Sequence, residues 1–172
     1  FVAQQFGTLF VENRYTAWGN YHPHNTLRNL WTLSRFFPAR KFQFELLNNR
    51  LNPDRYPGDP LAPGALDIRY ELACVFFANP LFWMELQHLA PEDQAALGKL
   101  LKIWKDCRAD LKDAEVLPIG RMPDGCSLTG FQADCGNGGG YLLLFREPLA
   151  PAEGVLPIRP VAAPASLRPL AS

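Results

Sequence analysis

Three glutamates recur at the ends of apolar segments and could supply acid–base chemistry. Glu12, Glu45 and Glu85 are separated by 33 and 40 residues, which is the length of successive strand–helix units. In a parallel barrel, active-site groups come from the carboxyl ends of the strands. Glycoside hydrolysis uses one carboxyl group to protonate the leaving oxygen and a second to attack the sugar or activate water. The spacing therefore favours a glycosidase-like site.

Aromatic residues near these glutamates support this interpretation, because rings stack on the faces of sugars. They are Tyr15, Trp18, Tyr21 and Trp83. A second interpretation stays open, in which the glutamates only form ion pairs at a barrel rim. Their partners would then be Arg14, Arg28 or Lys41.

His22 and His24 are the other residues whose types and spacing could do chemistry. In an extended chain, side chains two residues apart project to the same side. A metal site needs at least a third ligand, and no spacing in the sequence identifies one. We therefore favour a loop that orients a helix N-terminus or donates hydrogen bonds to sugar hydroxyls, and we expect no metal and no other cofactor.

Short apolar runs predict three strands in the first half of the chain. They cover residues 6–13, 41–48 and 79–86. In the second run, Phe42, Phe44 and Leu46 alternate with Gln43 and Glu45. The apolar set should pack on helices, which leaves Gln43 and Glu45 pointing into a barrel.

Segments with helical periodicity lie between these strands and after the last of them. Residues 26–37 predict a helix with Asn25 or Thr26 as its N-cap and Pro38 as its stop. Residues 65–78 are helix-like, and residues 91–113 form the clearest helix, with Pro91 at its start. Residues 49–64 form a long loop rich in Pro and Gly. Loops of this length in a compact domain more often have a function than not.

The pattern changes near Glu115. Segments 115–120, 126–133 and 140–147 are strand candidates separated by turn residues, which is typical of antiparallel hairpins. The order predicts an α/β part followed by an all-β part. We expect the last βα units of a (β/α)8 TIM barrel over 1–113 and the start of an antiparallel β-sandwich domain over 114–147. A Pro- and Ala-rich tail over 148–172 is expected to be extended or disordered.

Composition narrows the possible partners. Lys and Arg total 17 and Asp and Glu total 17, without a block of like charge, so we expect neither a nucleic-acid partner nor an anionic membrane surface. The apolar stretches are broken well short of the roughly 20 residues that a membrane span needs. We expect a soluble protein, cytoplasmic or exported. Because the chain begins at Phe1 inside an apolar run, it is expected to be an excerpt of a longer one.

The four cysteines form no C-x-x-C pair, which disfavours a zinc knuckle. Cys126 and Cys135 flank a loop. Free thiols are the favoured state of this pair, and a disulfide in an exported protein is the alternative.

Several long motifs carry a resemblance to a known family. They are "GTLFVENRYTAWGNYHPHNTLRNLW", "KFQFELLN", "ANPLFWMEL", "PIGRMPDGCSLTGFQA" and "GYLLLFRE". Over residues 6–147 the chain resembles the C-terminal part of α-galactosidase-like glycoside hydrolases. It is similar to the clan that holds glycoside hydrolase families 27, 31 and 36, and most of all to family 36-like proteins.

The resemblance implies a retaining enzyme with an Asp nucleophile on an earlier strand and an acid/base group after a later strand. The position that matches the acid/base group reads "VENRYT", so Glu12 is the catalytic candidate, where the family has an Asp. The nucleophile strand is absent from this chain. The 172 residues alone are therefore expected to be inactive, and the upstream part of the same polypeptide is expected as a partner.

The resemblance further implies an oligosaccharide or glycoside substrate bound at the rim of the barrel, with His24 or Asn25 helping to cap the next helix. The candidate substrate contacts are Asn13, Arg14, Tyr15, Trp18, Tyr21, His22, Glu45, Asn48 and Glu85. Two other functions remain open. One is a non-catalytic carbohydrate-binding protein, and the other is a structural remnant of a glycosidase.

Overall fold

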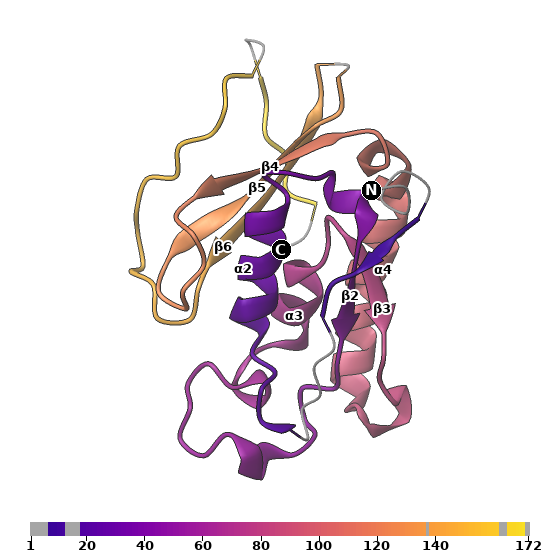
Figure 1. Ribbon diagram of the computed structural model, residues 1–172, viewed down its shortest axis with the longest axis vertical. Coiled ribbons are helices and arrows are strands. Elements are labelled where there is room, and N and C mark those ends of the chain that lie inside the picture. The colour runs from indigo at the N-terminus through magenta and orange to yellow at the C-terminus, as the bar shows by residue number, and fades with distance from the viewer. Residues whose placement is uncertain (1–6, 13–17, 137, 162–164, 171–172) are drawn as a thin grey trace.

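A parallel sheet lies in the N-terminal half of the protein (Figure 1). The computed structural model describes residues 7–12, 18–136, 138–161 and 165–170. Strands β1 (Leu9–Phe10), β2 (Phe42–Leu46) and β3 (Asn79–Phe82) pair in the order β1-β2-β3, and both pairings are parallel. Because all three strands run in the same direction, their carboxyl ends meet at one edge of the sheet.

In the part of the chain that the structure describes, three α-helices accompany the sheet, and short 3-10 turns link the elements. The helices are α2 (Pro23–Leu33), α3 (Ile68–Cys74) and α4 (Pro91–Leu111). The 3-10 turns are η2 (Ala39–Lys41), η3 (Pro53–Arg55), η4 (Pro63–Ala65) and η5 (Leu86–His88). Within the described ranges, no helix is both long enough and apolar enough to cross a membrane.

Helix α2 begins earlier than the sequence predicts. His22 is the N-cap residue, and its carbonyl oxygen accepts the N–H of Asn25 at 2.9 Å. The prediction of Asn25 or Thr26 as N-cap, and of His24 as a capping residue, is wrong. Pro23 explains the difference, because its fixed φ suits the first turn of a helix and it lacks an N–H that would need a partner. The helix also ends at Leu33, before Pro38.

The alternation along β2 divides its side chains as predicted. Phe42, Phe44 and Leu46 are buried in the hydrophobic core, together with Leu27 of α2 and Leu72 of α3. This is the face of the sheet that the helices cover. Packing of the apolar stripes of the helices against this face supplies the main driving force for the fold of this half.

An antiparallel sheet forms the second half. Strands β4 (Glu115–Gly120), β5 (Leu128–Asp134) and β6 (Gly140–Arg146) pair in the order β4-β5-β6. Its inner face joins the core of the first half, with the rings of Phe77 and Phe131 6.1 Å apart between centroids. The indole N–H of Trp31 also donates to the carbonyl oxygen of Ile119 at 3.2 Å. One hydrophobic core therefore spans both sheets.

The described part of the C-terminal tail is extended and lies along the antiparallel sheet (Figure 1). The Arg159 N–H donates to the side-chain oxygen of Gln132 at 2.8 Å, and the Gln132 amide donates back to the Arg159 carbonyl at 3.4 Å. Leu156 packs against Gly120, at a point where a side chain on the glycine would clash. These contacts hold a Pro-rich segment against the fold without regular secondary structure.

Glu147 anchors the loop between β4 and β5. Its side chain is fully buried, and its Oε2 accepts the N–H groups of Asp124 at 3.0 Å and Ser127 at 2.9 Å. Burial raises the pKa of Glu147, while these two donors act in the opposite direction. The Glu147 side chain therefore serves as the hydrogen-bond acceptor for two backbone N–H groups of this loop.

Replacement of Glu147 by alanine is expected to lower the free energy of unfolding by about 2–4 kcal/mol, because two backbone N–H groups lose their acceptor. Urea unfolding measures the change. Glu153→Ala is the matched control, since Glu153 is exposed, and its effect should stay within about 0.5 kcal/mol. Equal midpoints for the two variants would contradict the anchoring role.

Candidate functional site

Two buried glutamates lie near the carboxyl edge of the parallel sheet, one just after β1 and one near the end of β2. Glu12 comes two residues after β1 and is 6% exposed, and Glu45 is on β2 and is 4% exposed. The Glu12 carboxylate accepts the Thr26 hydroxyl at 2.7 Å and the Asn29 amide. Thr26 and Asn29 are three residues apart on α2, so both face the same carboxylate. Helix α2 thus fixes the orientation of Glu12.

A third buried carboxylate belongs to the same region. Glu71 on α3 is 1% exposed, and its Oε2 accepts the hydroxyl of buried Tyr21 at 3.0 Å. The Tyr21 N–H in turn donates to the hydroxyl of Tyr56 at 3.2 Å. Burial raises the pKa of Glu71 well above its ordinary value, and burial together with the Glu71 charge does the same to the pKa of Tyr21.

No protein-family model, curated protein or solved structure matches this chain. What the site does must therefore be argued from its geometry. The relevant features are the burial of the carboxyl groups of Glu12, Glu45 and Glu71 and the hydrogen bonds of Thr26 and Asn29 to Glu12 and of Tyr21 to Glu71.

Asn48 and Asn49 bring further polar groups to this edge of the sheet. The Asn48 side-chain oxygen accepts the Arg50 N–H at 2.8 Å, and the Asn49 amide donates to the Leu66 carbonyl at 3.1 Å. Among the described residues, Asn48 Nδ2, Asn49 Oδ1 and Glu71 Oε1 have no hydrogen-bond partner although they are buried. Such atoms are costly in a closed core and are typical of sites that bind a polar ligand or a proton.

A proton on Glu71 would remove part of this cost. The Asn49 side chain lies beside Glu71, and each contributes one unsatisfied acceptor oxygen. A carboxylic acid can donate from Oε1, whereas a carboxylate cannot. Burial is the main cause that raises the pKa of Glu71, whereas its side-chain hydrogen bonds with Tyr21 and Asn49 act in the opposite direction.

Glu71→Gln is expected to flatten the dependence of stability on pH. A carboxyl whose pKa is raised in the folded state binds its proton at pH values where the unfolded chain has lost it, so the free energy of unfolding falls as pH rises above about 4.3. Glutamine keeps the size and a donor but does not titrate. Urea midpoints of parent and variant at pH about 5 and pH about 8 test this, and the parent should lose more stability over that interval. Equal losses would show that Glu71 is ionised in the fold.

His22 is held by the loop over residues 49–64. Its Nε2 lies 2.7 Å from Asp59 Oδ2, and its ring meets the edge of Tyr56 with centroids 5.3 Å apart. The hydrogen bond from His22 is the main cause that lowers the pKa of Asp59. Within the described ranges, no group of three His, Cys, Asp or Glu side chains could hold a metal ion. The hydrogen bond between His22 and Asp59 connects the loop over residues 49–64 to the start of α2.

The same loop lines a cavity of about 370 Å³ next to this pair. Asn49, Tyr56 and Asp59 contribute polar atoms to its wall, and Leu51 and Ala62 contribute apolar surface. A mixed wall and a volume of this size are typical of small-molecule sites.

The remaining candidates from the sequence lie elsewhere or outside the described residues. Glu85 follows β3 but is exposed, and His88 Nε2 lies 3.0 Å from its carboxylate. Trp18 is 62% exposed. Asn13, Arg14 and Tyr15 fall outside the described residues. The structure therefore brings Glu12, Tyr21, His22, Glu45 and Asn48 to the carboxyl edge and leaves Glu85 in solvent contact.

The sequence analysis predicts a helix over residues 65–78 but does not predict Glu71 as a site residue. Ile68, Leu72 and Val75 recur at the spacing of one buried helix face, and Glu71 falls on that face three residues after Ile68. A charged residue on an apolar helix face is a signal for a buried, hydrogen-bonded group. That signal was present in the sequence.

Proposed function

We propose that this chain is part of a retaining glycoside hydrolase of the α-galactosidase-like type and that Glu12 is its acid/base group. The observation that carries the proposal is the pair of buried carboxylates, Glu12 and Glu45, at the shared carboxyl edge of parallel strands. Active sites of parallel α/β barrels lie at this edge. Glycoside hydrolysis requires carboxyl groups of this kind.

In the proposed mechanism, Glu12 protonates the oxygen of the leaving group and later removes a proton from water. Thr26 and Asn29 fix the direction of its carboxyl group. Tyr21, His22 and Asn48 are proposed substrate contacts, and Glu45 is proposed to hold a sugar hydroxyl. A retaining enzyme needs a nucleophilic carboxylate about 5 Å from the acid/base group. We propose that an Asp on an earlier strand of the same polypeptide supplies it.

The open edges of the parallel sheet support the proposal that further strands precede it in a barrel. Its outer strands β1 and β3 pair on one side only within the described part of the chain, and parallel sheets are normally covered on both faces and extended by further strands. Upstream strands of a barrel would pair with such edges. The proposal thus joins residues 1–113 to a catalytic barrel.

Hydrolysis assays test the proposal. The longer polypeptide that contains these residues and the 172-residue chain are each incubated with nitrophenyl glycosides, beginning with the α-galactoside. We expect turnover with retention of anomeric configuration, followed by NMR, for the longer polypeptide and none for the 172-residue chain. Turnover by the shorter chain, or inversion by the longer one, would refute the assignment of roles.

A second function is favoured by a specific observation. Both oxygens of Glu12 already accept hydrogen bonds from side chains of α2. A carboxylate in this state can serve to hold the helix while the site only binds a carbohydrate. Sugar binding detected by calorimetry in the longer polypeptide, without release of nitrophenol from any glycoside, would support this carbohydrate-binding role.

A further inference from the structure

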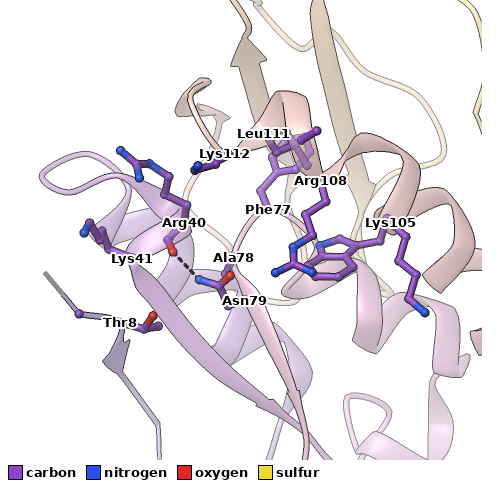
Figure 2. A pocket seen from close by; sticks show the side chains of 13 residues that line it. Thr8, Arg40, Lys41, Phe77, Ala78, Asn79, Lys105, Arg108, Leu111 and Lys112 are labelled. Atoms are coloured by element: carbon purple, nitrogen blue, oxygen red, sulfur yellow. Dashed lines mark hydrogen bonds between the residues drawn. The ribbon is translucent and has the colours of Figure 1, made fainter.

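A second cavity lies at the opposite, amino-terminal end of the parallel strands (Figure 2). Its volume is about 530 Å³. It is lined by Gly7 and Thr8 before β1, by η2, by the residues that lead into β3 and by the last turns of α4. Its cationic lining residues are Arg40, Lys41, Lys105, Arg108 and Lys112, and none of the described residues that line it is acidic.

The fold, and not the composition, produces this concentration of positive charge. The whole chain has equal numbers of acidic and basic residues, and the C-terminal part of α4 also carries Asp106 and Asp110. Neither aspartate lines the cavity, and Asp110 accepts the hydroxyl of Tyr141 at 2.5 Å. Within the described ranges, Arg40, Arg108 and Lys112 form no ion pair with a carboxylate. Clustered cations in a concave surface attract anions.

The wall of the cavity is fixed by interactions of its own. The Trp104 indole N–H donates to the Phe76 carbonyl at 2.9 Å, and the Arg108 guanidinium lies over the Trp104 ring, 5.2 Å from its centroid. The Asn79 amide donates to the carbonyl of Arg40 and holds η2 against β3. Figure 2 shows the Arg108 guanidinium on the side of the cavity that faces Asn79, whereas the ends of the Arg40, Lys41 and Lys105 side chains extend away from it.

We propose that this cavity binds a small, multiply charged phosphate compound. The guanidinium group of Arg108 can donate two parallel hydrogen bonds to phosphate oxygens, and Arg40 and Lys112 add positive charge to the lining of the cavity. Buried Phe77 and Leu111 offer an apolar wall to the organic part of a phosphate ester. The volume lies within the range of small-molecule sites. The proposal is independent of the glycosidase assignment.

Complementation of the helix dipole does not account for the whole arrangement. Cations near a helix C-terminus are stabilising, which explains Arg108 in the last turn of α4 and Lys112, the residue that follows the helix. It does not explain why Arg40 and Lys41, more than 60 residues earlier in the chain, line the same cavity. A ligand with negative charge on more than one side explains both groups.

Calorimetric titration of the 172-residue chain with pyrophosphate at low ionic strength tests the proposal. One equivalent is expected to bind. Arg108→Gln should weaken binding by about tenfold, because it removes a charge-assisted bidentate contact. Lys102→Ala, on the exposed surface of the same helix and outside the cavity, is the matched control and should leave the affinity unchanged.

The outcomes decide the proposal in either direction. Absence of binding, or equal weakening by Lys102→Ala, would overturn it, since the second result is that of unspecific charge attraction. Arg40→Ala is the second variant, to be used if thermal unfolding shows that Arg108→Gln does not fold, and it should also weaken binding by about tenfold. A single-stranded oligonucleotide that displaces pyrophosphate and binds more tightly would overturn the small-molecule assignment in favour of a nucleic-acid surface.

Discussion

Glu12→Gln is expected to lower turnover of the longer polypeptide by a factor of about 10²–10⁴, which is the usual contribution of a general acid. Glutamine has nearly the same shape and can still accept from Asn29 and contact Thr26, so the local structure should persist. It has no proton to give to the leaving oxygen. Substrate binding should therefore be retained while the chemical step is lost.

The leaving group gives a sharper readout of this role. Dinitrophenyl glycosides need little protonation, so the deficit of Glu12→Gln should shrink on them relative to a poor leaving group. Glu153→Gln, at an exposed position of the tail, is the matched control and should behave like the parent. Unchanged turnover of Glu12→Gln on poor leaving groups would exclude the acid/base role and leave Glu12 as a support for α2.

Phe131→Ala is expected to cost about 3–5 kcal/mol of unfolding free energy, as for other large buried aromatic residues. Phe131 is fully buried on β5 and contacts Phe77 across the space between the two halves. Its loss should therefore weaken both sheets together. Urea unfolding followed by tryptophan fluorescence and by far-UV circular dichroism measures the change, and the two transitions should coincide.

Leu144→Ala on β6 is the control for this substitution. Leu144 is more than half exposed, so its truncation should change the unfolding free energy by less than about 0.5 kcal/mol. Separate transitions in the parent would contradict a shared core. They would show that the antiparallel sheet, which the sequence assigns to its own domain over 114–147, unfolds on its own.

The sequence was most informative where one periodicity extended over a whole element. Alternation along 41–48 predicted that Phe42, Phe44 and Leu46 of β2 belong to the hydrophobic core, although Glu45 is buried as well. The apolar stripe from Pro91 predicted α4 within two residues of its end. Turn residues separated the later strands and predicted their antiparallel pairing. In each case a local pattern and the tertiary packing favour the same structure.

The sequence was less informative where partners distant along the chain decide the result. The burial of Glu71 depends on Tyr21, which is 50 residues earlier, and the docking of Arg159 depends on Gln132. Glu12 and Glu85 looked equivalent because both follow strands, yet only Glu12 has Thr26 and Asn29 beside it. Local patterns do not contain such pairings. The cationic cavity was missed for the same reason, since its residues come from separate elements.

The agreement between strand order and chain order affects how the protein can assemble during synthesis. Within each sheet, every strand after the first pairs with the strand made just before it, so a nascent chain can extend both sheets as it leaves the ribosome. The bond from Trp31 to Ile119 is different, because it joins residues 88 positions apart. At about 5–20 residues per second, α2 is exposed for several seconds before this partner emerges. Trp31 therefore lacks this hydrogen-bond partner until the segment around Ile119 has been synthesised.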